Sequence, residues 1–170
     1  VGGVMSADDF FTGTRSAVFG GTTTTLSFAQ QIPGESLRKS VQEYHECARP
    51  KAVIDYGFHL IISDPTEQVL GQDLPALVAD GMPSFKVYMT YDSLKLDDRQ
   101  MLEVLSTARR CGAMMMIHAE NHDMIKWLTD RLLSGGYVAP KFHAISHADI
   151  AEGEATHRAI RLSQLMDVPI

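Results

Sequence analysis

DDRQMLEVLSTARRCGAMMMIH, residues 97–118, contains a helix followed directly by a strand. Asp97 is a typical N-cap residue at the start of a helix, and Gly112 is a common residue just past a helix end. Between them, apolar residues recur at helical spacing on one face: Leu102, Leu105 and Ala108. Residues 113–117 are wholly apolar, which is typical of a short strand that is buried on both faces.

The same order of helix and strand repeats along the rest of the chain. Strands are expected where β-branched and apolar residues cluster, at 22–28, 52–62, 84–89 and 113–117. Helices are expected from a capping box at Ser6 to the glycine pair at 20–21, and over 35–47, 65–80, 97–111, 121–133 and 150–166. Asp64, followed by Pro65, and Asp149, with Glu152 three residues on, are expected to cap two of these helices.

This alternation predicts an α/β fold in which helices cover a parallel sheet, since strands that are apolar throughout are usually buried on both faces. A doubly wound sheet and an eight-stranded TIM-like (β/α)8 barrel both have this order of elements. No glycine-rich phosphate loop follows any strand, which favours the barrel. A barrel takes about 250 residues, so the chain is expected to form about half of one. Residues 168–170 are expected to begin the next strand.

Composition excludes several classes of partner. The 170 residues carry a formal net charge of -6 and no basic cluster beyond Arg109-Arg110, so neither nucleic acid nor an anionic membrane is expected. No apolar run of about 18 residues is present, and the start at Val1 lacks the pattern of a signal peptide. It also lacks an initiator methionine, so a piece of a longer protein is expected. Cys47 and Cys111 are expected to be buried small hydrophobes in a reducing cytoplasm.

Lys86 lies inside the apolar, aromatic run Ser84-Phe85-Lys86-Val87-Tyr88-Met89, where a lysine is rarely found. Burying an unpaired ammonium costs so much free energy that the group takes a partner or loses its proton. Two interpretations fit: a lysine that is paired or snorkels at a strand end, and a lysine whose amine is chemically changed. The second allows metal chemistry, because a neutral amine reacts with CO2 to give a carbamate whose two oxygens can bridge two divalent ions.

His118 directly follows the apolar residues 113–117, so its imidazole is expected at the carboxyl end of a buried strand. Active sites of parallel β/α folds lie at the carboxyl ends of strands, and Lys86 and His118 both fall there. A metal-binding histidine and a histidine hydrogen-bonded in the barrel mouth both fit this position. Glu120 is expected either to hydrogen-bond a metal shell or to cap the following helix.

Five segments carry a family resemblance, in a fixed order across nearly the whole chain. They are FGGTTT at 19–24, AVIDYGFH at 52–59, SFKVYM at 84–89, IHAEN at 117–121 and EGEATHRA at 152–159. Together they resemble dihydropyrimidinases and D-hydantoinases, cyclic amidases of the amidohydrolase superfamily. The resemblance implies a (β/α)8 barrel and a hydrolase that opens dihydropyrimidine and 5-substituted hydantoin rings to N-carbamoyl amino acids.

The resemblance also implies roles for single residues. Lys86 occupies the position of a carbamylated lysine that bridges two zinc ions (Zn²⁺), and His118 that of a histidine that ligates one of them. Tyr91 matches a tyrosine that binds the substrate carbonyl oxygen and stabilises the oxyanion, which makes it the expected catalytic and substrate-binding residue. Tyr88, on the same strand face as Lys86, is expected to line the pocket for the exocyclic group of the substrate or to belong to the core.

Other parts of that family's metal centre are not in the chain. A His-x-His pair on the first barrel strand, a histidine after the sixth strand and an aspartate after the eighth, the expected general base, would lie outside residues 1–170. The chain is therefore expected to be one partial barrel domain that lacks the first and last strands and is inactive alone. His147-Ala148 replaces a usual Arg-Pro pair, and His122 stands where the family often has glycine.

The remaining histidines, His45, His59, His122 and His157, are expected to have structural or surface roles. The methionines of residues 114–116 are expected to pack in the core. They do not form a soft-metal site, because successive side chains of a strand point to opposite faces.

Two other functions fit the sequence: an allantoinase or dihydroorotase-like hydrolase of another cyclic ureide, and a non-catalytic dihydropyrimidinase-like scaffold protein that has lost metal ligands. The presence of Lys86 and His118 argues against the scaffold. The resemblance favours a cytoplasmic zinc enzyme of pyrimidine catabolism. Such an enzyme binds a small cyclic ureide and assembles as a homo-oligomer, either a tetramer or a dimer.

Overall fold

The structure, a computed structural model, describes residues 6–170. The start of the chain at Val1, where a signal-peptide pattern is not expected, lies outside the described residues. None of the helices in the described part combines the length with the apolar character that a bilayer crossing requires.

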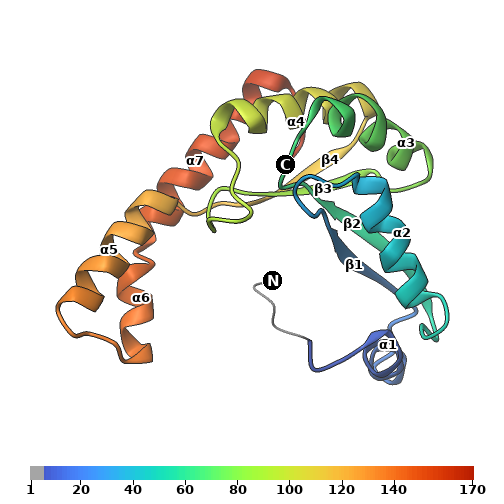
Figure 1. The fold of residues 1–170 in the computed structure, drawn as a ribbon, viewed down its shortest axis with the longest axis horizontal. Coiled ribbons are helices and arrows are strands. Elements are labelled where there is room, and N and C mark those ends of the chain that lie inside the picture. The colour runs from blue at the N-terminus through green and yellow to red at the C-terminus, as the bar shows by residue number, and fades with distance from the viewer. Residues whose placement is uncertain (1–5) are drawn as a thin grey trace.

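Four parallel strands form one sheet in the order β1-β2-β3-β4 (Figure 1). They are β1 (Thr24–Gln30), β2 (Asp55–Ile61), β3 (Ser84–Tyr88) and β4 (Met114–His118). Each strand pairs with the next one along the chain, as right-handed β/α crossovers produce. The predicted parallel sheet is therefore confirmed, with strand ends that shift by one to three residues.

Helices connect the strands and continue after them. The structure has α1 (Phe10–Phe19), α2 (Leu37–Ala48), a π-helical turn η1 (Val69–Asp73) that leads into α3 (Leu74–Ala79), α4 (Asp98–Cys111), α5 (His122–Ser134), a 3-10 turn η2 (Pro140–Phe142), α6 (His143–Ser146) and α7 (Asp149–Met166). Every expected helix is present, although η1 interrupts the one expected over 65–80. The short α6 lies where the sequence predicts only a loop.

The ends of α4 form as the sequence predicts. The Asp97 carboxylate accepts a hydrogen bond of 2.7 Å from the backbone N–H of Gln100, and the Gln100 side chain accepts one of 3.0 Å from the backbone of Asp97. Gly112 closes the helix in the left-handed region at φ 68°, which glycine adopts without steric cost. This helix therefore delivers the chain to β4 in a fixed direction.

Three other caps differ from the prediction. The expected box at Ser6 is wrong: Asp9 caps α1 together with Thr12. Asp64 does not cap its helix, since its carboxylate accepts from the backbone N–H of Gly34 at 2.9 Å. Asp149 is already the first residue of α7, and Ala148 is at the N-cap.

The expected burial of the two cysteines is also wrong. Cys47 is exposed and Cys111 is partly exposed. The core-facing side of α2 carries Leu37, Val41 and Ala48, so the neighbouring Cys47 points about 100° away from it.

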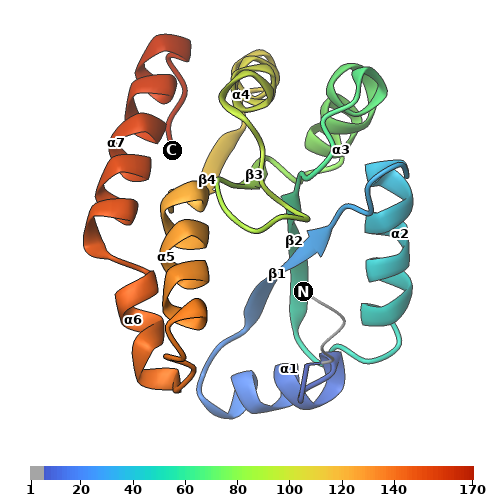
Figure 2. The ribbon, with the colours of Figure 1, turned by 60° about the vertical axis from the view of Figure 1, so that its left-hand side comes forward.

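The two faces of the sheet have different surroundings. One face carries Phe58, Leu60, Phe85, Val87 and Met115, which are buried beneath α2, α3 and α4 (Figures 1 and 2). The other face is open: Leu26, Phe28 and Met114 are 56%, 41% and 46% exposed. The sheet thus carries apolar side chains on both faces, but only one face is covered within residues 6–170.

The C-terminal part of the chain lies along one edge of this unit. Helix α7 runs beside α4 and α5 (Figure 2) and contributes Ala155 and Ala159 to the core. The strand expected to begin at 168–170 is not formed as a strand. A single hydrogen bond, from the N–H of Met115 to the carbonyl of Pro169 at 3.3 Å, joins this end to β4.

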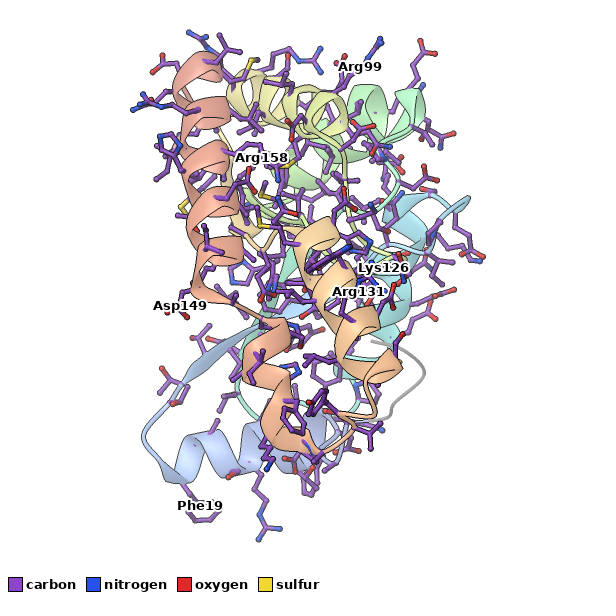
Figure 3. The ribbon with its side chains drawn as sticks, turned by 90° about the vertical axis from the view of Figure 1, so that its left-hand side faces the viewer. Phe19, Arg99, Lys126, Arg131, Asp149 and Arg158 are labelled. Carbon is purple, nitrogen blue, oxygen red and sulfur yellow. The ribbon has the colours of Figure 1, made fainter. Side chains whose placement is uncertain are left out.

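We expect the chain to self-associate through the open sheet face, because exposed apolar patches and free strand edges favour association. Replacing Leu26→Lys places a charge in that face and is expected to shift the chain toward monomer in sedimentation velocity at micromolar concentration. Phe19→Lys is the matched control, since Phe19 is an exposed aromatic side chain that points away from the ribbon at the end of α1 (Figure 3). A wild-type chain that sediments as a monomer would contradict this expectation.

Candidate functional site

The carboxyl ends of β3 and β4 bring together the residues that the sequence singles out. Tyr88 pairs in register with His118, and Lys86 pairs with Met116 two positions earlier. Because residues two apart on a strand face the same way, Lys86, Tyr88 and His118 all lie on the open face of the sheet. The predicted gathering of these side chains is therefore observed.

Aromatic rings pack around His118. The ring centroids of Tyr88 and His118 lie 5.5 Å apart with the planes 24° from parallel, and those of Tyr91 and His118 lie 5.3 Å apart. The two tyrosine rings are themselves 5.8 Å apart. Three elements, β3, β4 and the turn after β3, thus place two phenol groups beside one imidazole.

Lys86 lies among aromatic rings. Its Nζ is 5.2 Å from the ring centroid of Tyr88 and 5.6 Å from that of Phe28 on β1, which are cation–π distances. Among residues 6–170, no carboxylate forms an ion pair with it, and the side chain is only half-buried. The ion-paired interpretation of Lys86 therefore finds no partner in the described chain.

Tyr88 keeps its proton at neutral pH. Partial burial raises the pKa of its phenol above the usual 10.0, and the neighbouring Tyr91 raises it further. A neutral phenol on this face is a hydrogen-bond donor, and its ring forms one wall beside His118.

Tyr91 occupies a strained turn. Its φ of 70° lies in the left-handed region, which costs a non-glycine residue about 1–2 kcal/mol. Its carbonyl accepts hydrogen bonds of 2.9 Å from the N–H groups of Leu94 and Lys95, and Leu96 donates to the carbonyl of Tyr88 at 2.9 Å. These bonds hold the turn against the strain, and strained residues of this kind cluster at functional sites.

Glu120 contacts His118, one of its two expected roles. Its carboxylate accepts a hydrogen bond of 2.7 Å from Nε2 of His118. The other expected role, a cap on the following helix, is wrong: the side chain of Asn121 caps α5 by accepting from Met124 at 3.0 Å. A carboxylate on one imidazole nitrogen fixes the ring orientation and leaves the other nitrogen as an acceptor.

The donor groups of the described residues are too few to complete a metal site. Within residues 6–170, no group of three His, Cys, Asp or Glu side chains is close enough to hold a metal ion. On the open face, His118 could supply a nitrogen ligand, and Lys86 could supply an oxygen ligand if its amine were carboxylated. Any complete site needs ligands from beyond the described residues.

Side-chain hydrogen bonds that the sequence did not predict hold the loops that lead into α4 and α5. On α7, the guanidinium of Arg158 donates to Glu154 at 2.9 Å and to Asp98 at 2.6 Å, and Asn121 donates to Glu154 at 2.6 Å. Arg158 lies on the inner side of α7 (Figure 3). The network ties α7 to the starts of α4 and α5. From the sequence, only the Glu154–Arg158 pair could be predicted, because residues four apart on a helix lie side by side.

The hydrogen bond from Arg158 lowers the pKa of the Glu154 carboxyl below its ordinary 4.5, although partial burial acts in the opposite direction. On Arg158, burial lowers the pKa, but the hydrogen bonds to Glu154 and Asp98 outweigh this and raise it. Both groups are therefore charged at neutral pH.

The other histidines have structural surroundings, apart from His122. Nδ1 of His59 lies 2.5 Å from Ser84 Oγ, and Nδ1 of His45 lies 3.4 Å from the hydroxyl of Tyr56. His157 accepts from Arg161 on the surface of α7. His122 lies within 3.1 Å of Asp92, a contact that sequence reasoning missed because Asp92 is in the turn after β3 whereas His122 begins α5.

One further expectation needs correction, and one segment without an expected structure is now defined. Of the three methionines expected in the core, only Met115 is fully buried, and Met114 faces the open side. The segment around His147-Ala148 forms a 3-10 turn and α6, in which the His147 ring lies 4.0 Å from that of His143.

Curated relatives that match the chain are hydantoinases. The chain is 45% identical over 166 residues to a D-hydantoinase of Geobacillus stearothermophilus and 42% identical over 167 residues to a D-hydantoinase of Rhizobium radiobacter. The matches cover 96% and 98% of the chain but 35% and 36% of the relatives. The chain thus spans about a third of the length of these proteins. No protein-family model matches it.

Solved structures show the same arrangement. A dihydropyrimidinase from Brevibacillus agri NCHU1002 superposes with a TM-score of 0.94 at 45% identity, over 98% of this chain and 36% of that one. An L-hydantoinase (dihydropyrimidinase) from Arthrobacter aurescens has a TM-score of 0.81 at 21% identity, over 94% of this chain and 35% of that one, and shows the fold alone. These structures confirm the expected fold, a part of a (β/α)8 barrel.

Glu154→Gln is expected to destabilise the chain more at neutral pH than in acid. Because the folded-state pKa is lowered, the ionised carboxylate contributes stability above pH 4.5, and this is lost as the pH falls through the lowered value. We expect a loss of about 0.5 kcal/mol in the free energy of unfolding at pH 7, given solvent screening, and a smaller loss at pH 3. Urea unfolding at both pH values measures this, with Glu152→Gln as the control on the same helix. Equal losses at both pH values would contradict it.

Tyr91→Gly is expected to be more stable than Tyr91→Ala by about 1 kcal/mol, because both variants lose the ring but only alanine keeps the strain at φ 70°. At nearby Ser93, the control pair is expected to show the ordinary order, with alanine the more stable. Urea unfolding of the four variants gives the comparison. An Ala variant as stable as the Gly variant at position 91 would mean that the turn is not strained.

Proposed function

We propose a function from the similarity of the chain to D-hydantoinases and dihydropyrimidinases. The chain matches these proteins over about a third of their length. The proposed activity of the whole protein is hydrolytic ring opening of cyclic amides, namely dihydropyrimidines and 5-substituted hydantoins. Water adds across one amide C–N bond, so that the carbonyl carbon becomes a carboxylate and the ring nitrogen takes a proton. The product is an N-carbamoyl amino acid.

The observation that carries this proposal is the position of Tyr91. Its ring lies against His118 at the open strand ends, and its backbone is held in a conformation that tyrosine rarely adopts. We assign the Tyr91 phenol as the donor to the substrate carbonyl oxygen, where negative charge builds as the ring opens. Tyr88, which stays neutral beside it, would line the pocket for the exocyclic substituent.

The proposed cofactor is a pair of zinc ions. Lys86, carboxylated at Nζ, would bridge them, and His118 would ligate one through Nδ1, since Nε2 donates to Glu120. When bound, the ions supply a Lewis acid for the amide carbonyl and activate water at neutral pH. The absence of a carboxylate partner for Lys86 within residues 6–170 supports this assignment, because no ion pair there holds the amine in its protonated form.

Beyond this site, we propose a cytoplasmic homo-oligomer that takes small cyclic ureides. Hydantoins are favoured over allantoin and dihydroorotate, because the similar proteins carry hydantoinase and dihydropyrimidinase names.

A segment exchange tests the proposal. Residues 1–170 replace the matching segment of the Geobacillus stearothermophilus D-hydantoinase, and release of N-carbamoyl product from hydantoin and dihydrouracil is measured. The chimera is expected to bind zinc and turn over, whereas residues 1–170 alone are expected to show no turnover. Tyr91→Phe is expected to lower kcat by about 10²-fold to 10³-fold with little change in KM, as for loss of an oxyanion donor.

Three further variants accompany this experiment. Lys86→Ala and His118→Ala are expected to lose zinc, measured by metal analysis, together with activity. Tyr137→Phe removes an exposed phenol after α5 and is expected to change neither. A folded, zinc-loaded chimera that is inactive on every cyclic ureide would overturn the proposal, and one active only on allantoin or dihydroorotate would reassign its substrate.

A further inference from the structure

His122 is the first residue of α5, and its ring lies beneath the turn that carries Tyr91. Its Nε2 is 3.1 Å from a carboxylate oxygen of Asp92, the residue that directly follows Tyr91. The two residues and Tyr91 line one cavity of about 370 Å³ between this turn and α5. The first turn of α5 is thus joined to the Tyr91 turn by a close contact between an imidazole nitrogen and a carboxylate oxygen.

The two ends of this contact differ in freedom. The side chain of His122 is 13% exposed, whereas that of Asp92 is 74% exposed. A buried ring is fixed by its packing, while an exposed carboxylate is free unless something holds it. The contact therefore restrains Asp92, and with it the backbone of the neighbouring Tyr91.

The start of α5 is itself rigid. The backbone N–H of Asn121 donates to the carbonyl of Ala151 at 3.0 Å, and its side chain donates to Glu154 at 2.6 Å. The same short segment carries His118 three residues before Asn121. An anchor at His122 thus fixes the position of Tyr91 relative to the short segment 118–122, which also carries His118.

Tyr91 needs such an anchor. Its left-handed backbone costs free energy, and strain of this kind persists only where the surroundings hold it. Lys126, one turn along α5 (Figure 3), also approaches Asp92, but at 3.7 Å and with an exposed side chain. Exposed pairs at such a distance contribute little.

We propose that His122 is a positioning residue that holds the Tyr91 turn through Asp92, and so sets the place of the Tyr91 hydroxyl relative to His118. The effect of His122 on catalysis rests on the proposed function. Its restraint of the Tyr91 turn does not depend on that function and is measured separately.

The first measurement is hydrogen exchange on the whole 170-residue chain. The amides of Leu94 and Lys95 donate to the Tyr91 carbonyl, so their exchange reports opening of the turn. His122→Ala is expected to speed this exchange about fivefold, the upper range for an exposed ion pair. His122→Gln, whose side-chain nitrogen can still reach Asp92, is expected to restore slow exchange. Lys126→Gln is the matched control and is expected to change nothing.

The second measurement is turnover by the chimera described above. His122→Ala is expected to lower kcat about tenfold with KM within about twofold, because a misplaced donor weakens only the transition state. His122→Gln is expected to recover most of kcat. Asp92→Ala is expected to match His122→Ala, and the double variant to be no worse than either.

Each outcome decides a separate point. Unchanged exchange in His122→Ala, or equal loss in His122→Gln, would overturn the anchoring of the turn. Fast exchange with an unchanged kcat would overturn its catalytic consequence. An inactive wild-type chimera would count against the proposed function alone, because the exchange result still supports or rejects the anchor.

Discussion

The register between β3 and β4 is the constraint on which the site depends. Tyr88 opposite His118, and Lys86 opposite Met116, place three polar side chains on one face, while Phe85 and Val87 enter the core. A slip of one residue would move the whole set to the other face, because strand side chains alternate with a period of two. Burial of Phe85 and Val87 excludes that slip, so the same packing that stabilises the sheet also fixes which residues face a substrate.

Register alone does not place the groups that follow the strands. Tyr91, Glu120 and Asn121 follow the strands, and Asn121 is held by contacts with a helix much later in the chain. Helix α7 supplies Glu154 and Arg158, which hold the starts of α5 and α4. Parallel β/α folds separate a rigid sheet from variable loops in this way, so precision at the strand ends is a property of the surrounding helices.

The sequence predicts what is encoded locally. Asp97 and Gln100 form their box, Gly112 ends α4, and the apolar runs form parallel strands, because each signal lies within a few residues of its effect. Asp64 fails as a cap because Gly34, distant in sequence, competes for its carboxylate. For the same reason, the sequence does not predict the aromatic surroundings of Lys86 or the contact between His122 and Asp92. Both join segments that only the fold brings together.

Lys86 links the open face to the chemistry. Its amine faces the rings of Phe28 and Tyr88, on the side of the sheet where Leu26 and Met114 remain exposed. Any surface that covers those apolar residues also removes water from the amine. Burying an ammonium there without a carboxylate is costly, whereas a carbamate that ligates metal exchanges the isolated positive charge for a satisfied anion. If Lys86 is carboxylated as proposed, covering the hydrophobic face would favour that modification, because burial makes the unmodified ammonium unfavourable.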